Sequence, residues 1–130
     1  MRILIDESLP ALLAAELEGF DVSTVRRQGW IGLRNGVLLR AAVDAGFDVV
    51  ITADRALRYQ QNLRTIGISV LVLVRVRNRF RDVRMLVPQI LSILPLLRPG
   101  DSHEIAPLPG DAICDREIPQ FAVSATGVGQ

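Results

Sequence analysis

Four short runs rich in apolar and β-branched residues, separated by segments with helical features, constrain the fold of this chain more than any other feature of its sequence. The runs have the length of β-strands, and they cover residues 2–6, 20–25, 48–52 and 69–74. Strands that are apolar along their whole length are typical of a sheet covered on both faces, and strands that alternate with helices usually run parallel. The pattern therefore predicts an α/β fold, namely a three-layer α/β/α sandwich with a mostly parallel sheet of four or more strands.

The segments after the first two runs carry the start and stop signals of helices. Ser8 suits the N-cap of a first helix, in which Pro10 is tolerated in the first turn and which Gly19 can end. Asn35 suits the N-cap of a second helix, which Gly46 can end. We therefore expect one helix between the first and second strands, and another between the second and third.

The C-terminal half continues the alternation and then leaves it. The segment RALRYQQNL predicts a short third helix, and a helical apolar stripe begins at Phe80, where Pro88 should kink or split the helix. After Gly100 the apolar periodicity stops. The sequence thus predicts an α/β domain over residues 1–98 and an extended or partly disordered acidic tail over residues 99–130.

Composition narrows the class of protein and of site. The chain has 130 residues, 49% of them hydrophobic, which is ample for the core of one domain. It has neither an apolar run that could cross a bilayer nor the features of a signal peptide, so we expect a cytoplasmic protein without a membrane partner. The single Cys114 and single His103 favour neither a disulfide nor a zinc site. Any metal would be held by oxygen atoms, which favours Mg²⁺ or Mn²⁺.

Charge is distributed unevenly. All 15 basic residues are Arg, with 14 of them and nine acids in residues 1–100, but one Arg and five acids in residues 101–130. Arginine offers planar donor pairs suited to phosphate. An all-arginine composition is equally compatible with a base bias of the genome, so it does not by itself predict nucleic-acid binding.

Acidic residues follow two of the predicted strands at corresponding places. Asp6 and Glu7 come directly after the first strand, and Asp54 follows the third strand, which ends in Thr52. Because parallel strands end at the same edge of a sheet, we expect Asp6 and Asp54 within reach of one hydrated divalent cation. Such an ion can polarise a phosphodiester and activate water. Each Asp could instead be a helix cap, and Glu7 could be a solvated side chain, because neighbouring residues leave a strand in opposite directions.

The segments after the third and fourth strands are rich in arginine. We take as candidate nucleic-acid-binding residues Arg55, Arg58, Asn78 and Arg79. The alternation of Arg75 and Arg77 with valines is equally typical of an exposed strand end. Tyr59 and Trp30 could stack on bases, although a lone Trp is more often part of a core or an interface.

Four segments of the sequence resemble the PIN-like toxin family, whose members are small relatives of PIN-domain ribonucleases. They are ILIDESLP, GWIGLRNGVLL, VVITADRALRYQQNL and NRFRDVRMLVPQIL. The resemblance covers about residues 1–97, and its most specific motifs are DE-x-LP and T-x-D-x-x-LRYQQN. It does not extend to the tail.

This resemblance implies a PIN-like α/β/α sandwich and a Mg²⁺- or Mn²⁺-dependent ribonuclease, usually the toxin of a toxin–antitoxin pair. The implied partners are RNA and an antitoxin protein. Asp6 and Asp54 take the places of two family acids, which makes them the candidate catalytic and metal-binding residues, with Glu7 as a further metal ligand. Thr52 belongs to the T-x-D motif.

One position departs from the family pattern. Relatives often read NGELL where this chain reads NGVLL, so Val37 occupies the place of an acid on a helix. Losing one of three carboxylates should weaken cation binding. Asp44 lies about 10 Å further along the helix, too far to replace the acid, whereas Asn35 and Glu7 are closer candidates.

Two other functions fit parts of the sequence. A catalytically weak or inactive PIN-like module that binds RNA or protein would explain Val37. A receiver-like signalling domain would explain Asp6, Glu7 and Asp54, but such domains use a lysine that this chain lacks, and they have five strands where the sequence predicts four. The small size and the apolar fourth helix are compatible with a homodimer.

Overall fold

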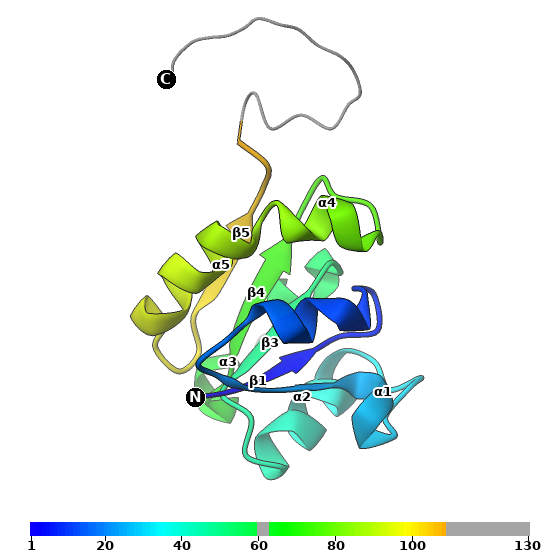
Figure 1. Ribbon diagram of the computed structural model, residues 1–130. Helices are drawn as coiled ribbons and strands as arrows, with labels where there is room; N and C mark the ends of the chain where they lie inside the picture. The colour runs from blue at the N-terminus through cyan, green and yellow to red at the C-terminus, as the bar shows by residue number, and fades with distance from the viewer. Residues whose placement is uncertain (60–62, 109–130) are drawn as a thin grey trace, which may run out of the picture.

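The computed structural model describes residues 1–59 and 63–108 and contains one sheet of five parallel strands (Figure 1). The strands are β1 (Arg2–Ile5), β2 (Asp21–Thr24), β3 (Val49–Thr52), β4 (Ser69–Leu73) and β5 (Ser102–Ile105). Their order in the sheet is β2-β1-β3-β4-β5. The predicted α/β class and parallel sheet are confirmed.

Short helices connect the strands. The α-helices are α1 (Val25–Gln28), α2 (Asn35–Asp44), α3 (Leu63–Ile66), α4 (Phe80–Arg84) and α5 (Val87–Ile93). The 3-10 helices are η1 (Ala11–Glu16), η2 (Arg55–Tyr59) and η3 (Leu94–Leu96). None of the helices within the described residues is both long and apolar enough to span a bilayer.

Successive strand residues pack into two separate cores, one on each face of the sheet. Ile5 and Ile51 pack with η1, α4 and α5, whereas Leu4 and Val50 pack with α1 and α2. Figure 1 shows η1 in blue and α5 in yellow-green in front of the strands. A strand that is buried on both faces has a continuous apolar sequence. This is why apolar runs that alternate with helical segments predicted a three-layer sandwich.

The strand order creates a switch point between β1 and β3. From β1 the chain moves outward to β2 and then returns past β1 to β3, which pairs with β1 on its other side. In doubly wound sheets, ligands bind beyond the carboxyl ends of the strands at such a point. Asp6 and Asp54 follow these two strands.

The first two helices begin differently from the prediction. Ser8 does not cap the first helix, because its hydroxyl bonds to Asp6, and the segment forms the 3-10 helix η1 with Pro10 at the N-cap. Helix α2 starts at Asn35 itself, with Arg34 rather than Asn35 as the N-cap residue. The predicted glycine stops are present, since Gly46 has a φ of 89° beyond the end of α2.

The C-terminal part contains the largest difference from the sequence analysis. Residues 102–105, assigned to the tail, form β5, which pairs in parallel with β4. Only Ile105 of this strand is buried, so an edge strand of this kind carries no apolar run that sequence could reveal. The sheet therefore has five strands rather than the four that were counted, and it extends past the domain boundary predicted at residue 98.

The tail prediction for residues 109–130 lies outside the described residues. As expected, Pro88 splits the preceding helical segment, into α4 and α5.

Candidate functional site

Asp6 is the buried acid at the switch point. It directly follows β1, is 7% exposed, and donates its backbone N–H to the carbonyl of Ile51 at 2.9 Å, which fixes it beside the end of β3. Its Oδ2 accepts hydrogen bonds from the hydroxyls of Ser8 and Thr52, both at 2.7 Å. The carboxylate of Asp6 is thus held by both neighbouring segments.

In this network, backbone N–H groups donate to the two hydroxyls, and the hydroxyls donate to the carboxylate of Asp6. The backbone N–H groups of Ala53 and Asp54 donate to the hydroxyls of Ser8 and Thr52 at 3.0 and 2.9 Å. Each hydroxyl has one proton, and both protons are used on Asp6. Thr52, which is 0% exposed, therefore links the side chain of Asp6 to the backbone of Asp54.

The other carboxylate oxygen of Asp6 is open to a ligand. Within residues 1–59 and 63–108, Oδ1 accepts no hydrogen bond, and it is not one of the buried unpaired oxygens. No basic side chain of the same described residues forms a salt bridge with Asp6. Asp6 lines a hollow of about 390 Å³, the acid hollow, together with Glu7, Ser8, Leu33, Arg34, Leu38, Asp54, Ala56 and Leu57.

Asp54 is both a helix cap and part of this hollow. Its Oδ1 accepts the backbone N–H of Ala56 at 2.9 Å, and its carbonyl accepts that of Leu57 at 3.2 Å, so it caps η2. Asp54 is exposed and lines the acid hollow with Asp6. The two interpretations that the sequence left open are therefore compatible with each other.

Glu7 has a structural contact that the sequence did not reveal. Its Oε1 accepts the backbone N–H of Gly32 at 3.0 Å, which ties the loop before α2 to the end of β1. Gly32 has a φ of 97°, a conformation that favours glycine. Glu7 lines the acid hollow, but this hydrogen bond occupies one of its oxygens.

Besides Glu7, two carboxylates of the described residues line the acid hollow, those of Asp6 and Asp54. In that part of the chain, no group of three or more His, Cys, Asp or Glu side chains is placed to hold a metal ion. Val37 is 62% exposed and does not line the acid hollow, although its helix neighbours Arg34 and Leu38 do. Two carboxylates still suit Mg²⁺, which usually keeps several waters and binds one or two protein carboxylates together with substrate phosphate. The donor set therefore fits a magnesium-type ion but not a closed protein cage.

The predicted nucleic-acid ligands are only partly brought together. Arg55 pairs with Glu104 of β5, with 3.7 Å between Nε and Oε2. Arg79 is exposed at the N-cap of α4. Asn78 lines a second hollow that it shares with Asp6. The side chains of Arg58 and Asn35 are not among those that the structure describes.

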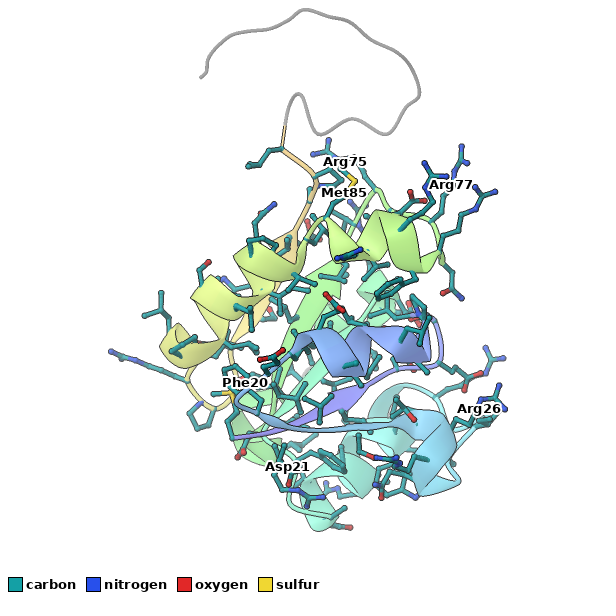
Figure 2. All side chains as sticks on the ribbon, in the orientation of Figure 1. Phe20, Asp21, Arg26, Arg75, Arg77 and Met85 are labelled. Atoms are coloured by element: carbon teal, nitrogen blue, oxygen red, sulfur yellow. The ribbon has the colours of Figure 1, made fainter. Side chains whose placement is uncertain are left out.

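Arginines nevertheless gather at the carboxyl edge of the sheet. Figure 2 shows Arg26, Arg75 and Arg77 at the side toward which the strands point, whereas Asp21 lies at the opposite end. Trp30 is partly buried and packs edge-on against Phe47, with 6.1 Å between ring centroids, so it belongs to a core.

Four polar residues of the two hollows were not predicted as site residues from the sequence. Ser8 was interpreted as a helix cap, and Thr24, Arg26 and Arg34 were not singled out. A polar residue two positions after an acid at a strand end is the one signal that could have indicated Ser8. A further acid, Asp82 of α4, is buried with Oδ2 unpaired among the described residues, but it lines neither hollow.

The comparisons with known proteins add no relative. Neither a protein-family model, nor a curated protein sequence, nor a solved structure matches the chain.

Proposed function

We propose that this protein is a Mg²⁺- or Mn²⁺-dependent endoribonuclease and the toxin component of a toxin–antitoxin pair. The observation that carries the proposal is the carboxylate of Asp6, which is fixed through Oδ2 and lines a hollow that Asp54 also lines. The sequence segments that resemble PIN-like toxins supply the reaction class. A cytoplasmic location and an antitoxin partner belong to the same proposal.

Several polar residues in and next to the acid hollow have a role in this proposal. Asp6 and Asp54 would hold the cation, which when bound polarises a phosphodiester and lowers the pKa of water. Ser8 and Thr52 act as positioning residues, because their hydroxyls fix the orientation of Asp6. Arg34, exposed at the edge of the acid hollow, would bind a phosphate oxygen of the substrate.

The second candidate is a PIN-like module that binds RNA or a protein partner without cutting RNA. The exposed Val37 at the place of a family acid and the two-carboxylate donor set favour it. The five strands and their order favour the hypothesis of a receiver-like domain, because flavodoxin-like receivers share them. The chain contains no lysine, however, and this remains the argument against phosphoryl transfer to Asp54.

Metal titration separates the enzyme from the binding module. We expect saturable Mn²⁺ binding to the purified protein by calorimetry, and Mn²⁺-dependent cleavage of single-stranded RNA that a chelator stops. Asp54→Asn should abolish both, because it removes one of two charged ligands. Asp44→Asn is the matched control, since Asp44 is an exposed acid that lines neither hollow.

The opposite results would decide against the enzyme. If the wild-type protein bound no Mn²⁺ at millimolar concentrations, the nuclease hypothesis would be rejected. Equal loss of Mn²⁺ binding in Asp54→Asn and Asp44→Asn would show that the titration reports general surface charge rather than the acid hollow.

A further inference from the structure

A second hollow lies beside Asp6, and the proposed function does not use it. It has a volume of about 230 Å³ and is bounded by the start of η1, the start of α1 and the loop after β4. Asp6 and Glu7 line both hollows, so the second hollow adjoins the acid hollow along the segment that follows β1.

The lining of the second hollow combines an apolar surface with polar side chains. Ile5, Leu9 and Val25 contribute apolar side chains that are 0–4% exposed, Thr24, Arg26 and Asn78 contribute polar groups, and Asp6 and Glu7 contribute carboxyl groups. Binding sites for small organic groups have this composition, with apolar walls for shape and a few polar groups for orientation. The volume is below the roughly 300–1,000 Å³ of sites for drug-sized molecules, so it suits one flat group.

Two of the polar residues are placed to meet such a group. The Asn78 side chain carries both a donor and an acceptor, and the residue is the centre of a tight turn that the N–H of Arg79 closes on the carbonyl of Arg77 at 2.7 Å. Arg26 is exposed at the start of α1, and it forms no salt bridge with a residue of the described ranges 1–59 and 63–108.

We propose that this second hollow is a base subsite, which binds one unpaired nucleobase of a single-stranded RNA next to the phosphodiester that Asp6 faces. The base lies against the apolar side chains, Asn78 forms hydrogen bonds with its edge, and Arg26 binds an adjoining phosphate. This inference rests on the proposed ribonuclease function and adds to it the residue that selects the sequence cut. RNA fits better than a peptide, because the subsite combines an amide with an arginine that forms no salt bridge within the described residues, beside a candidate phosphodiester site.

Binding without metal tests the base subsite separately from cleavage. The probes are fluorescently labelled oligoadenylate, oligocytidylate and oligouridylate of equal length, measured by anisotropy in the presence of a chelator. We expect wild-type protein to prefer one of the three, and Asn78→Ala to reduce that preference by about tenfold, the discrimination of one lost hydrogen-bonded contact to a base. Asn78→Asp, which keeps the shape but loses the donor, should change the order of preference.

Arg26 and a control arginine complete the design. Arg26→Ala should weaken binding of all three oligomers alike and reduce its dependence on salt concentration. Arg40→Ala removes the same charge from an exposed helix residue that lines neither hollow, and it should have a smaller effect. Circular dichroism of each variant checks that it is folded.

The outcomes of this experiment and of the metal titration are distinguishable. A preference that depends on Asn78 in a protein that cuts no RNA would support the base subsite and overturn only the nuclease. RNA cleavage with a base preference that Asn78→Ala leaves unchanged would overturn the base subsite alone. Wild-type protein that binds none of the three oligomers, or binds them equally, would also overturn it.

Discussion

Thr52 is the single residue on which most of the site geometry depends. It is fully buried, donates to Oδ2 of Asp6 and accepts the backbone N–H of Asp54. A buried hydroxyl that connects two functional segments fixes their relative position, since moving either one breaks a hydrogen bond. Thr52 belongs to the T-x-D motif, but the motif does not reveal that its hydroxyl points to Asp6, which lies 46 positions away in the chain.

Thr52→Val should destabilise the protein and weaken its metal site. Valine keeps the volume but leaves the N–H of Asp54 without its acceptor and Asp6 with one donor fewer, at a cost of about 1–3 kcal/mol in the free energy of unfolding. Loss of an outer partner of a metal-binding carboxylate typically lowers metal affinity by roughly 10- to 100-fold. Urea denaturation and Mn²⁺ titration measure the two effects.

Thr52→Ser provides the matched control for this prediction. Serine keeps the hydroxyl and loses one buried methyl group, which costs about 1 kcal/mol in stability. Its Mn²⁺ affinity should stay close to that of the wild type. If the serine and valine variants bound Mn²⁺ equally weakly, the hydroxyl would not position Asp6 for metal binding.

At the scale of the elements, the residues at the start of helix α2 determine which charged groups this helix brings to the edge of the acid hollow. Its N-cap residue Arg34 and its fourth residue Leu38 line the acid hollow, while Val37 between them is exposed and the first turn contains no acid. The position of the helix is further fixed by the hydrogen bond from Gly32 to Glu7. Helix α2 therefore brings an arginine, rather than a third carboxylate, to the edge of the acid hollow.

Val37→Glu should raise metal affinity without loss of stability. The new carboxylate would sit in the first turn of α2, where the helix dipole favours negative charge, and glutamate has a higher helix propensity than valine. A third charge near the hollow should strengthen Mn²⁺ binding by about tenfold, equivalent to about 1.4 kcal/mol. RNA cleavage should rise in parallel.

Val37→Gln separates the charge from the change of shape. It has the same length as glutamate and no charge, so its Mn²⁺ affinity should equal that of the wild type. Identical Mn²⁺ binding by wild type, Val37→Gln and Val37→Glu would mean that a side chain at this position of α2 does not reach an ion in the acid hollow.

At the scale of the whole molecule, the layers of the fold could be predicted from the sequence, but the complete sheet could not. Apolar runs such as residues 48–52 are visible because both faces of a central strand are buried. The strand order was not visible, since nothing local states that β1 lies between β2 and β3. β5 was missed for the opposite reason, because an edge strand with two exposed residues has no apolar run.

Removal of β5 should therefore destabilise the whole domain. A chain ending at Gly100 loses the strand that pairs with β4, the buried side chain of Ile105, and the salt bridge from Arg55 to Glu104. It also leaves the backbone groups of β4 unpaired along one edge, which favours aggregation. Burial of Ile105 alone contributes about 1.5–3 kcal/mol, so a chain without β5 should unfold at a clearly lower urea concentration.

A chain ending at Leu108 is the control, because it keeps every strand and helix of the described residues. It should unfold in one cooperative transition with a midpoint close to that of the full chain, and it should still bind Mn²⁺ through Asp6 and Asp54. If the chain ending at Gly100 were as stable as the one ending at Leu108, β5 would not be an integral strand of the sheet. The domain boundary would then return to residue 98, as the sequence alone predicts, and Arg55 would be available to bind phosphate rather than held by Glu104.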